Sequence, residues 1–171
     1  MKKVLAIILA LTMATGLLSA CGSSDTTEPT PAATPETTEP TAEPTVEAQS
    51  NIDKALALIN TFATGDTETA RELLDENYIQ HNLAYGTGED AFVASVEGLA
   101  AAPVKTTVHN IRAFADGDYV FLQTVYNFAG AGDQVAFDIF RFDGDGKIAE
   151  HWDVMETIAD ESTWQNPNGK F

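Results

Sequence analysis

The acidic residue Asp138 lies inside a mostly apolar stretch of sequence, VAFDIFRF, at Val135–Phe142. Such a stretch is typical of a buried strand, in which successive side chains point to opposite faces. Asp138 then shares its face with Ala136, Phe140 and Phe142. A carboxylate among apolar side chains is costly unless it is partnered, so Asp138 is either held for structural reasons or functional.

A second group of polar residues follows one tight turn later. The turn DGDG at 143–146 supplies the Gly and Asp that a short hairpin needs, so we expect the chain to return as a neighbouring strand. On that strand one face carries His151, Asp153 and Met155, and the other carries mostly Ile148, Trp152 and Val154. Two acids and an imidazole can therefore meet at one place, and such groups can transfer protons.

The residues His81, His151, Asp138 and Asp153 can also be written as a set of metal ligands. No two of them have HxH or HExxH spacing, and the DGDG turn is too short for an EF-hand loop. The sequence also has no Gly-rich phosphate loop and no nucleophile elbow. We therefore expect neither a metal nor another cofactor.

The first twenty residues carry two lysines, an apolar run and the segment LLSA directly before Cys21, which is the only cysteine. This pattern is typical of a secretory signal peptide, and the apolar run is shorter than the ~20 residues of a membrane-spanning helix. Small residues before a cysteine resemble a bacterial lipobox. We expect residues 1–20 to be removed and Cys21 to be lipidated, which anchors the protein to the extracytoplasmic face of the cell membrane. Ordinary cleavage that leaves a free thiol is the alternative.

Residues 21–50 are rich in Thr, Pro and Glu and contain no basic and no aromatic residue. Such a segment cannot bury a core, so we expect a disordered tether. Residues 51–171 have the length of one ordinary domain. The formal net charge of −17 argues against nucleic acid and anionic lipid headgroups as partners.

The hydrophobic pattern of the domain predicts helices followed by strands. Helical spacing of apolar residues indicates three helices at 52–63, 66–74 (with Asp66 as N-cap) and 89–101. Strand-like runs separated by DGD, GAGD and DGDG lie at 104–115, 119–128, 134–142 and 147–158. The order predicts an α+β domain in which the helices pack on one face of a curved antiparallel sheet of four or more strands. A pocket between these layers suits a small ligand.

Three phrases of the sequence, read in order, resemble a known family. They are YIQHN at Tyr78–Asn82, GDYVFL at Gly117–Leu122 and FDIFRFDGDGKIAEHWDV at Phe137–Val154. Together with the order of elements, they are similar to the SnoaL-like branch of the NTF2-like superfamily, over nearly all of residues 51–171. That superfamily has a cone-shaped α+β fold and includes polyketide cyclases, ketosteroid isomerase, limonene epoxide hydrolase and members without known activity.

The resemblance to ketosteroid isomerase implies roles for two residues. Asp138 matches the protonated aspartic acid that donates a hydrogen bond to the oxyanion, so it would be a neutral acid in an apolar pocket. The catalytic base of the isomerase falls on or next to His81, where this chain has an imidazole. The isomerase's oxyanion tyrosine has no clear counterpart here, because the first helix offers Asn60 and Thr61. The structural alternative for Asp138 is a buried acid tied to Arg141, Arg112 or a backbone donor. The structural alternative for His81 is a turn residue whose ring caps a helix end or bonds a carbonyl.

We therefore predict a small-molecule pocket with catalytic or orienting groups at His81, Asp138 and Asp153. Ligand contacts are predicted for Tyr78, Asn82, Phe140, His151 and Met155. One function is a binding module for a small apolar or carbonyl-bearing ligand, or a pocket without activity. The alternative is an acid–base enzyme, an aldol-type cyclase or isomerase, which abstracts a proton next to a carbonyl. The resemblance also favours a homodimer.

Overall fold

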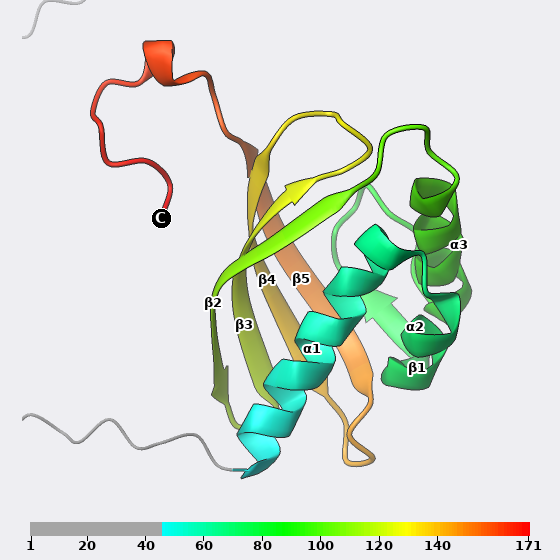
Figure 1. Cartoon of the computed structure of the whole chain (residues 1–171). Coiled ribbons are helices and arrows are strands. Elements are labelled where there is room, and N and C mark those ends of the chain that lie inside the picture. Colours follow the sequence, from blue (N-terminus) through cyan, green and yellow to red (C-terminus); the bar gives the residue numbers. More distant parts are fainter. Residues whose placement is uncertain (1–45) are drawn as a thin grey trace, which may run out of the picture. The chain divides into compact units, whose positions relative to one another are not determined.

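The computed structural model describes residues 46–171. The predicted signal peptide, the lipidated Cys21 and nearly all of the predicted tether lie outside the described residues. Within them, three helices pack on one face of a five-stranded mixed sheet, as Figure 1 shows. The predicted α+β fold with N-terminal helices on a curved sheet is confirmed.

The helices are α1 (Val46–Thr64), α2 (Thr67–Leu73) and α3 (Glu89–Ala100). Asp66 caps α2 as predicted, because its side chain accepts a hydrogen bond from the Thr69 amide at 3.0 Å. Helix α1 begins at Val46, six residues earlier than predicted. None of the helices within residues 46–171 is long and apolar enough to cross a membrane.

The sheet has the strand order β1-β5-β4-β3-β2. Four strands form the predicted antiparallel meander: β2 (Thr107–Asp116), β3 (Tyr119–Asn127), β4 (Gln134–Phe142) and β5 (Ile148–Thr157). A short 3-10 helix, Glu161–Thr163, follows them. The fifth strand, β1 (Leu74–Gln80), was not predicted and runs parallel to β5. Leu74 and Tyr78 are buried, but Glu76 midway between them is exposed because the pairing shifts at a bulge, so the alternation that marks a strand is missing.

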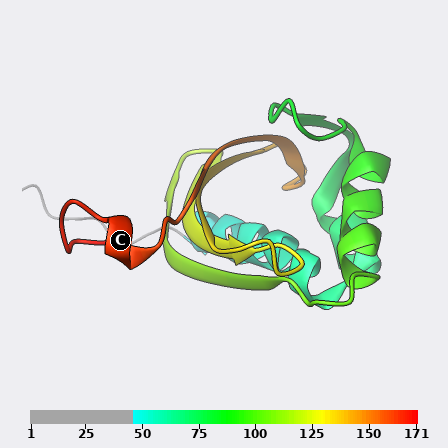
Figure 2. The same cartoon turned by 90° about the horizontal axis from the view of Figure 1, so that it is seen from above.

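The sheet curls around α1, as the view from above in Figure 2 shows. The bulges in β2 and β5 are consistent with this curvature, because a bulge increases the local bend and twist. The bulge in β5 also corrects one expectation. Ile148 is fully buried in the core, although the prediction put it with Trp152 on the opposite face, because the pairing shifts between Glu150 and Ile148.

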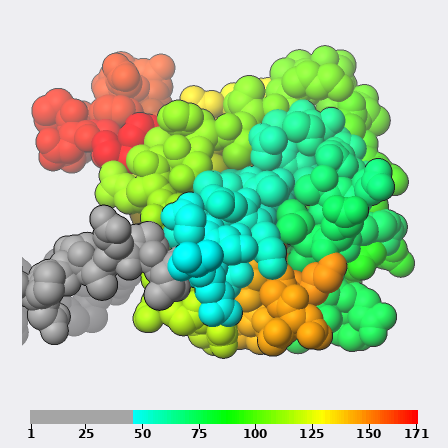
Figure 3. All heavy atoms as spheres, turned by 60° about the horizontal axis from the view of Figure 1, so that its bottom comes forward, coloured from blue at the N-terminus to red at the C-terminus, as the bar shows by residue number. Residues whose placement is uncertain are grey.

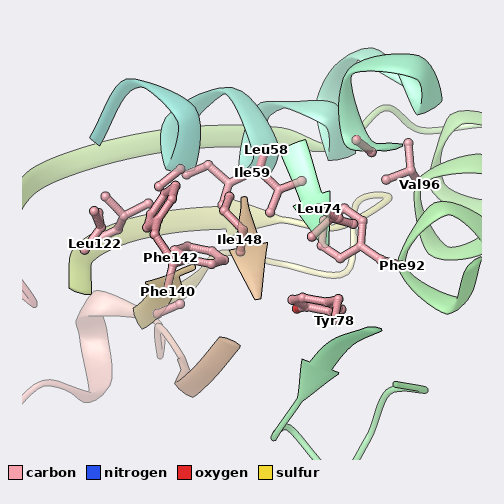
Figure 4. Close-up of a cluster of buried hydrophobic side chains, with 14 of the residues drawn as sticks. Leu58, Ile59, Leu74, Tyr78, Phe92, Val96, Leu122, Phe140, Phe142 and Ile148 are labelled. Carbon is pink, nitrogen blue, oxygen red and sulfur yellow. The ribbon is translucent and has the colours of Figure 1, made fainter. Parts of the chain in front are cut away.

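The core fills the space between α1, α3 and the inner face of the sheet. Figure 4 shows Leu58 and Ile59 of α1 above Phe140, Phe142 and Ile148. The β4–β5 turn is tied to α1, because the Lys54 ammonium donates a hydrogen bond to the Gly146 carbonyl at 2.6 Å. Figure 3 shows this turn beside α1 on the molecular surface. Gly146 has φ of 73°, the left-handed conformation that favours glycine in such a turn.

Candidate functional site

A partly open cavity of about 160 Å³ lies between the inner face of the sheet and the helices α1 and α3. Six aromatic rings line it, from Phe62, Tyr85, Phe92, Tyr126, Phe128 and Phe140. Its carboxyl, imidazole and amide groups are those of Gln80, Asp138, His151 and Asp153. The ligand atoms of Asp138, His151 and Asp153 all lie within 4.8 Å of one another. The cavity is therefore mostly apolar, with its polar groups gathered at one place.

Asp138 accepts hydrogen bonds from two neighbouring strands. The Tyr126 hydroxyl of β3 donates to its Oδ2 at 2.9 Å, and His151 Nε2 of β5 lies 3.3 Å from its Oδ1. Burial, followed by the nearby Asp138 charge, raises the pKa of Tyr126 well above its ordinary value, so the phenol keeps its proton and donates. Two hydrogen-bonding groups thus face one buried carboxyl. The predicted role of Asp138 as a donor to a ligand stays a prediction.

Asp138 does not pair with an arginine. Arg141 points to the outer face of the sheet, where it donates to Glu150 Oε1. The alternative that Asp138 is tied to an arginine is therefore wrong. The acid is held by a phenol and an imidazole that both line the cavity.

Gln80 sets the orientation and tautomer of His151. The backbone N–H of Asn82 donates to Gln80 Oε1 at 2.9 Å, which fixes which end of the amide is oxygen. The amide nitrogen then lies 3.0 Å from His151 Nδ1 and 3.1 Å from the Tyr78 hydroxyl. Because an amide nitrogen only donates, Nδ1 accepts, and the proton of the neutral ring sits on Nε2 facing Asp138.

Asp153 faces Asp138 directly across the β4–β5 pair. Asn82 Nδ2 donates to its Oδ1 at 2.7 Å, while its Oδ2 is 4.0 Å from His151 Nε2. The Asp153 side chain is only 7 % exposed. Burial raises its pKa above the ordinary value, although His151 and the Asn82 hydrogen bond act in the opposite direction. Asp153 therefore has one oxygen held in place and the other facing the polar end of the cavity.

The cavity wall beside these groups includes two further predicted residues. The ring of Phe140 stacks on the His151 imidazole with a centroid distance of 4.4 Å and an interplanar angle of 11°. Met155 also lines the cavity. The structure thus brings together Asp138, Phe140, His151, Asp153 and Met155, whose functional roles remain predictions.

Three predicted residues do not line the cavity. His81 lies on the outer face, where its Nε2 is 3.0 Å from Glu150 Oε2 and its ring stacks on Trp152 at 4.5 Å. The expected inward position of His81 is not met, because Gln80 is the residue of β1 that pairs with His151 and points inward. Tyr78 is buried against Phe92, edge to face, as Figure 4 illustrates. Asn82 does not line the cavity but donates a hydrogen bond to Asp153, which does.

Two residues of the site were missed by sequence reasoning. Gln80 stands within the YIQHN phrase, two residues after Tyr78, and strand alternation would have placed it on the inner face. Tyr126 was not among the residues predicted for the site. Its hydroxyl has its partner on β4, and this contact depends on tertiary register that the sequence does not display.

The comparisons with known proteins concern this same domain. The SnoaL-like domain family matches residues 55–151. Comparison with curated proteins finds no match. Solved structures with a similar fold include a Mycobacterium tuberculosis epoxide hydrolase resembling limonene epoxide hydrolase. It is 19 % identical with a TM-score of 0.57, and the alignment covers 64 % of this chain and 85 % of that one.

Two further similar structures have other described activities. A candidate ketosteroid isomerase from Kribbella flavida is 14 % identical with a TM-score of 0.58, covering 72 % of this chain and 94 % of that one. A candidate polyketide cyclase, IdmH from Streptomyces antibioticus, is 22 % identical with a TM-score of 0.50, covering 62 % and 91 %. At these identities the likeness shows the fold alone. The family match over residues 55–151 and the shared fold establish that the chain belongs to the SnoaL-like domain family, with the NTF2-like fold.

Proposed function

We propose that the domain binds a small, mostly apolar molecule in the cavity between the sheet and the helices. The observation that carries this proposal is a partly open cavity of about 160 Å³ that has aromatic walls and is lined at one end by Asp138, His151 and Asp153. Pockets of this kind, largely apolar with a few convergent polar groups, are the usual sites of small ligands. The polar groups orient the ligand and the rings supply contact area.

Filling the cavity tests this proposal. Leu99 of α3 lines the cavity, so Leu99→Trp should occupy the ligand's space. We expect ligand-induced thermal shifts of the wild-type protein with a panel of small cyclic molecules, and their loss in Leu99→Trp. Phe137→Trp on the outer face is the matched control, since Phe137 is 55 % exposed and does not line the cavity. Shifts that survive in Leu99→Trp would contradict the proposal.

The second candidate function is acid–base catalysis, and the position of Asp153 favours it. A carboxylate with a raised pKa, one oxygen anchored by Asn82 and the other facing the ligand, has the properties of a general base. It would take a proton from carbon next to a carbonyl, as in an aldol-type cyclase or isomerase. The His151 Nε2–H is the neutral donor next to it.

Isotope exchange separates the two candidates. A general base should catalyse exchange of the protons beside the carbonyl of cyclohexanone for deuterium in D2O, followed by NMR. Asp153→Asn should abolish this exchange, while a bound ligand should still produce a thermal shift of the variant. Binding without measurable exchange in the wild-type protein would leave the binding module as the function.

We also propose that the domain is displayed outside the cytoplasm on a lipidated Cys21, as a homodimer or a monomer. The support is the sequence around Cys21, which lies outside the described residues. Cys21→Ser should move the protein from the membrane fraction to the soluble fraction and abolish labelling by radioactive fatty acid. Membrane association that persists in this variant would contradict the anchor.

A further inference from the structure

Two carboxyl groups share the polar end of the cavity with a single imidazole. Asp138 and Asp153 both lie there with side chains 5 % and 7 % exposed. Among the described residues that line the cavity there is no lysine or arginine. Arg141, on the same strand as Asp138, is bound to Glu150 on the opposite face. A buried carboxylate without a counter-charge is unfavourable, so the pocket attracts a cation.

His151 directs its donor at Asp138 and not at Asp153. Its Nδ1 accepts a hydrogen bond from the Gln80 amide, whose orientation is fixed by the Asn82 backbone N–H. Its Nε2 lies 3.3 Å from Asp138 Oδ1 and 4.0 Å from Asp153 Oδ2. The imidazole therefore leaves Asp153 Oδ2 without a donor at hydrogen-bond distance.

One oxygen atom at this place is free to receive a ligand. Asp153 Oδ1 is bound by Asn82, whereas no hydrogen bond within residues 46–171 reaches Oδ2. The nearest charged or ionisable neighbour of Oδ2 is His151 Nε2 at 4.0 Å, and Asp153 lines the cavity. The side chain is more than nine-tenths buried. This oxygen can therefore accept a hydrogen bond from a donor group of a ligand.

The walls of the cavity suit an organic cation better than a metal ion. Six aromatic rings surround the space, and the faces of such rings attract an ammonium group while its hydrocarbon part packs against them. A metal would need the His151 lone pair, which is directed at Gln80 and away from the two carboxylates. The shape and chemistry of the site thus point to one class of ligand.

We infer that the cavity binds a small apolar amine in its ammonium form, with an N–H directed at Asp153 Oδ2 and its hydrocarbon part against the aromatic rings. This inference rests on the proposed binding function and names its ligand class. Binding should shift Asp153 to its ionised form, so amine affinity should fall as the pH is lowered. The other titratable groups around Asp153 are Asp138, His151, Tyr78, Tyr85 and Tyr126.

The test compares two probes that share a ring and differ in charge. Cyclohexylamine and cyclohexanol are titrated into the purified full-length protein by isothermal calorimetry at pH 7.5 and pH 5. We expect the amine to bind at least ten times more tightly than the alcohol at pH 7.5, and this preference to shrink at pH 5. Asp153→Asn should lower amine affinity by about tenfold and leave alcohol affinity within twofold. Glu150→Gln, with the same loss of charge on the outer face, should change neither.

The outcomes separate the inference from the function on which it rests. Equal or tighter binding of the alcohol, or an unchanged amine preference in Asp153→Asn, would overturn the amine inference and leave the pocket standing. Tight binding of Zn²⁺ that displaces the amine would overturn it in favour of a metal site. Absence of binding by both probes, together with no thermal shift for any cyclic molecule, would overturn both proposals. The comparison of amine and alcohol binding to the wild-type protein tests the amine inference even if Asp153→Asn does not fold.

Discussion

Two histidine–carboxylate pairs lie on opposite faces of the same sheet and differ in almost everything except their residue types. In the outer pair, His81 Nε2 is 3.0 Å from Glu150, and the side chains are 40 % and 20 % exposed. In the inner pair, His151 Nε2 is 3.3 Å from Asp138, and the side chains are 9 % and 5 % exposed. The shorter pair is the one open to solvent. Burial and neighbouring groups therefore determine the energetic contribution of each pair more than its N–O distance does.

The neighbours of the two acids explain the difference. Glu150 is also bound by Arg141, and this hydrogen bond, with that of His81, holds the pKa of Glu150 below its ordinary value. Asp138 has no lysine or arginine beside it and faces a phenol and an imidazole. The outer acid is thus bound by an arginine within the protein, while the inner acid has no such partner.

The largest expected effect comes from the wall of the inner site. Phe140 is 1 % exposed and stacks on His151, so Phe140→Ala should leave a cavity and destabilise the domain by about 3–5 kcal/mol. Phe137, on the outer face of the same strand, is 55 % exposed, and Phe137→Ala should cost less than about 1 kcal/mol. Urea unfolding measures both. Similar losses for the two variants would mean that the outer face is covered in solution.

The next largest effect should come from the buried acid. In Asp138→Asn, an amide replaces a carboxylate that faces two donors, so one donor loses its acceptor. We expect a loss of about 2–3 kcal/mol. Glu150→Gln makes the same chemical change in the outer pair and should cost less than about 1 kcal/mol, because water replaces the lost contacts. Equal costs in urea unfolding would contradict the distinction between the two pairs.

The inward positions of the residues in the inner site could largely be predicted from the alternation of side chains along the strands. The bounds of β4 match the prediction, and the shared face of His151 and Asp153 follows from the period of two. The inward turn of Asp138 toward the same place follows in the same way. These residues stand in regular stretches with tight turns, where local pattern and final structure agree.

The remaining parts of the site depend on contacts that local pattern does not contain. The strand β1 carries a bulge and pairs with β5, which is about seventy positions further along the chain. A short phrase such as YIQHN resembles a family without fixing which of its residues faces inward, and a shift by one residue reverses the face. That shift is why His81 was expected in the cavity, where Gln80 is found.

A smaller effect, with a definite dependence on pH, should come from Asp153. Its folded-state pKa is raised above the ordinary value of 3.8, mainly by burial. As pH rises from 3.8 through the raised pKa, the unfolded state ionises first, so the wild-type protein loses stability over that window. Asp153→Asn lacks this loss and keeps an acceptor for Asn82. It should be more stable than wild type at pH 7 by on the order of 1 kcal/mol, with little advantage at pH 3.5.

Thermal unfolding at several pH values measures this prediction. Asp75→Asn is a suitable control, because Asp75 is a surface carboxyl of β1 outside the cavity. An advantage of Asp153→Asn that is constant over pH would show that ionisation of Asp153 is not its cause. A loss of stability at pH 7 would show that the carboxylate is stabilised in the empty pocket.

The smallest effect is expected for His81, which the family resemblance had suggested as a base. The imidazole is 40 % exposed, shares Glu150 with Arg141 and stacks on Trp152 outside the cavity. His81→Gln should therefore cost no more than about 0.5 kcal/mol and leave cyclohexylamine binding within twofold of wild type. His151→Gln is the matched change in the inner pair and should weaken both stability and binding, because it removes the ring that stacks on Phe140 and the Nδ1 atom that accepts from Gln80. A loss of binding in His81→Gln would mean that the outer histidine reaches the ligand in solution, which would restore the role that the sequence had suggested.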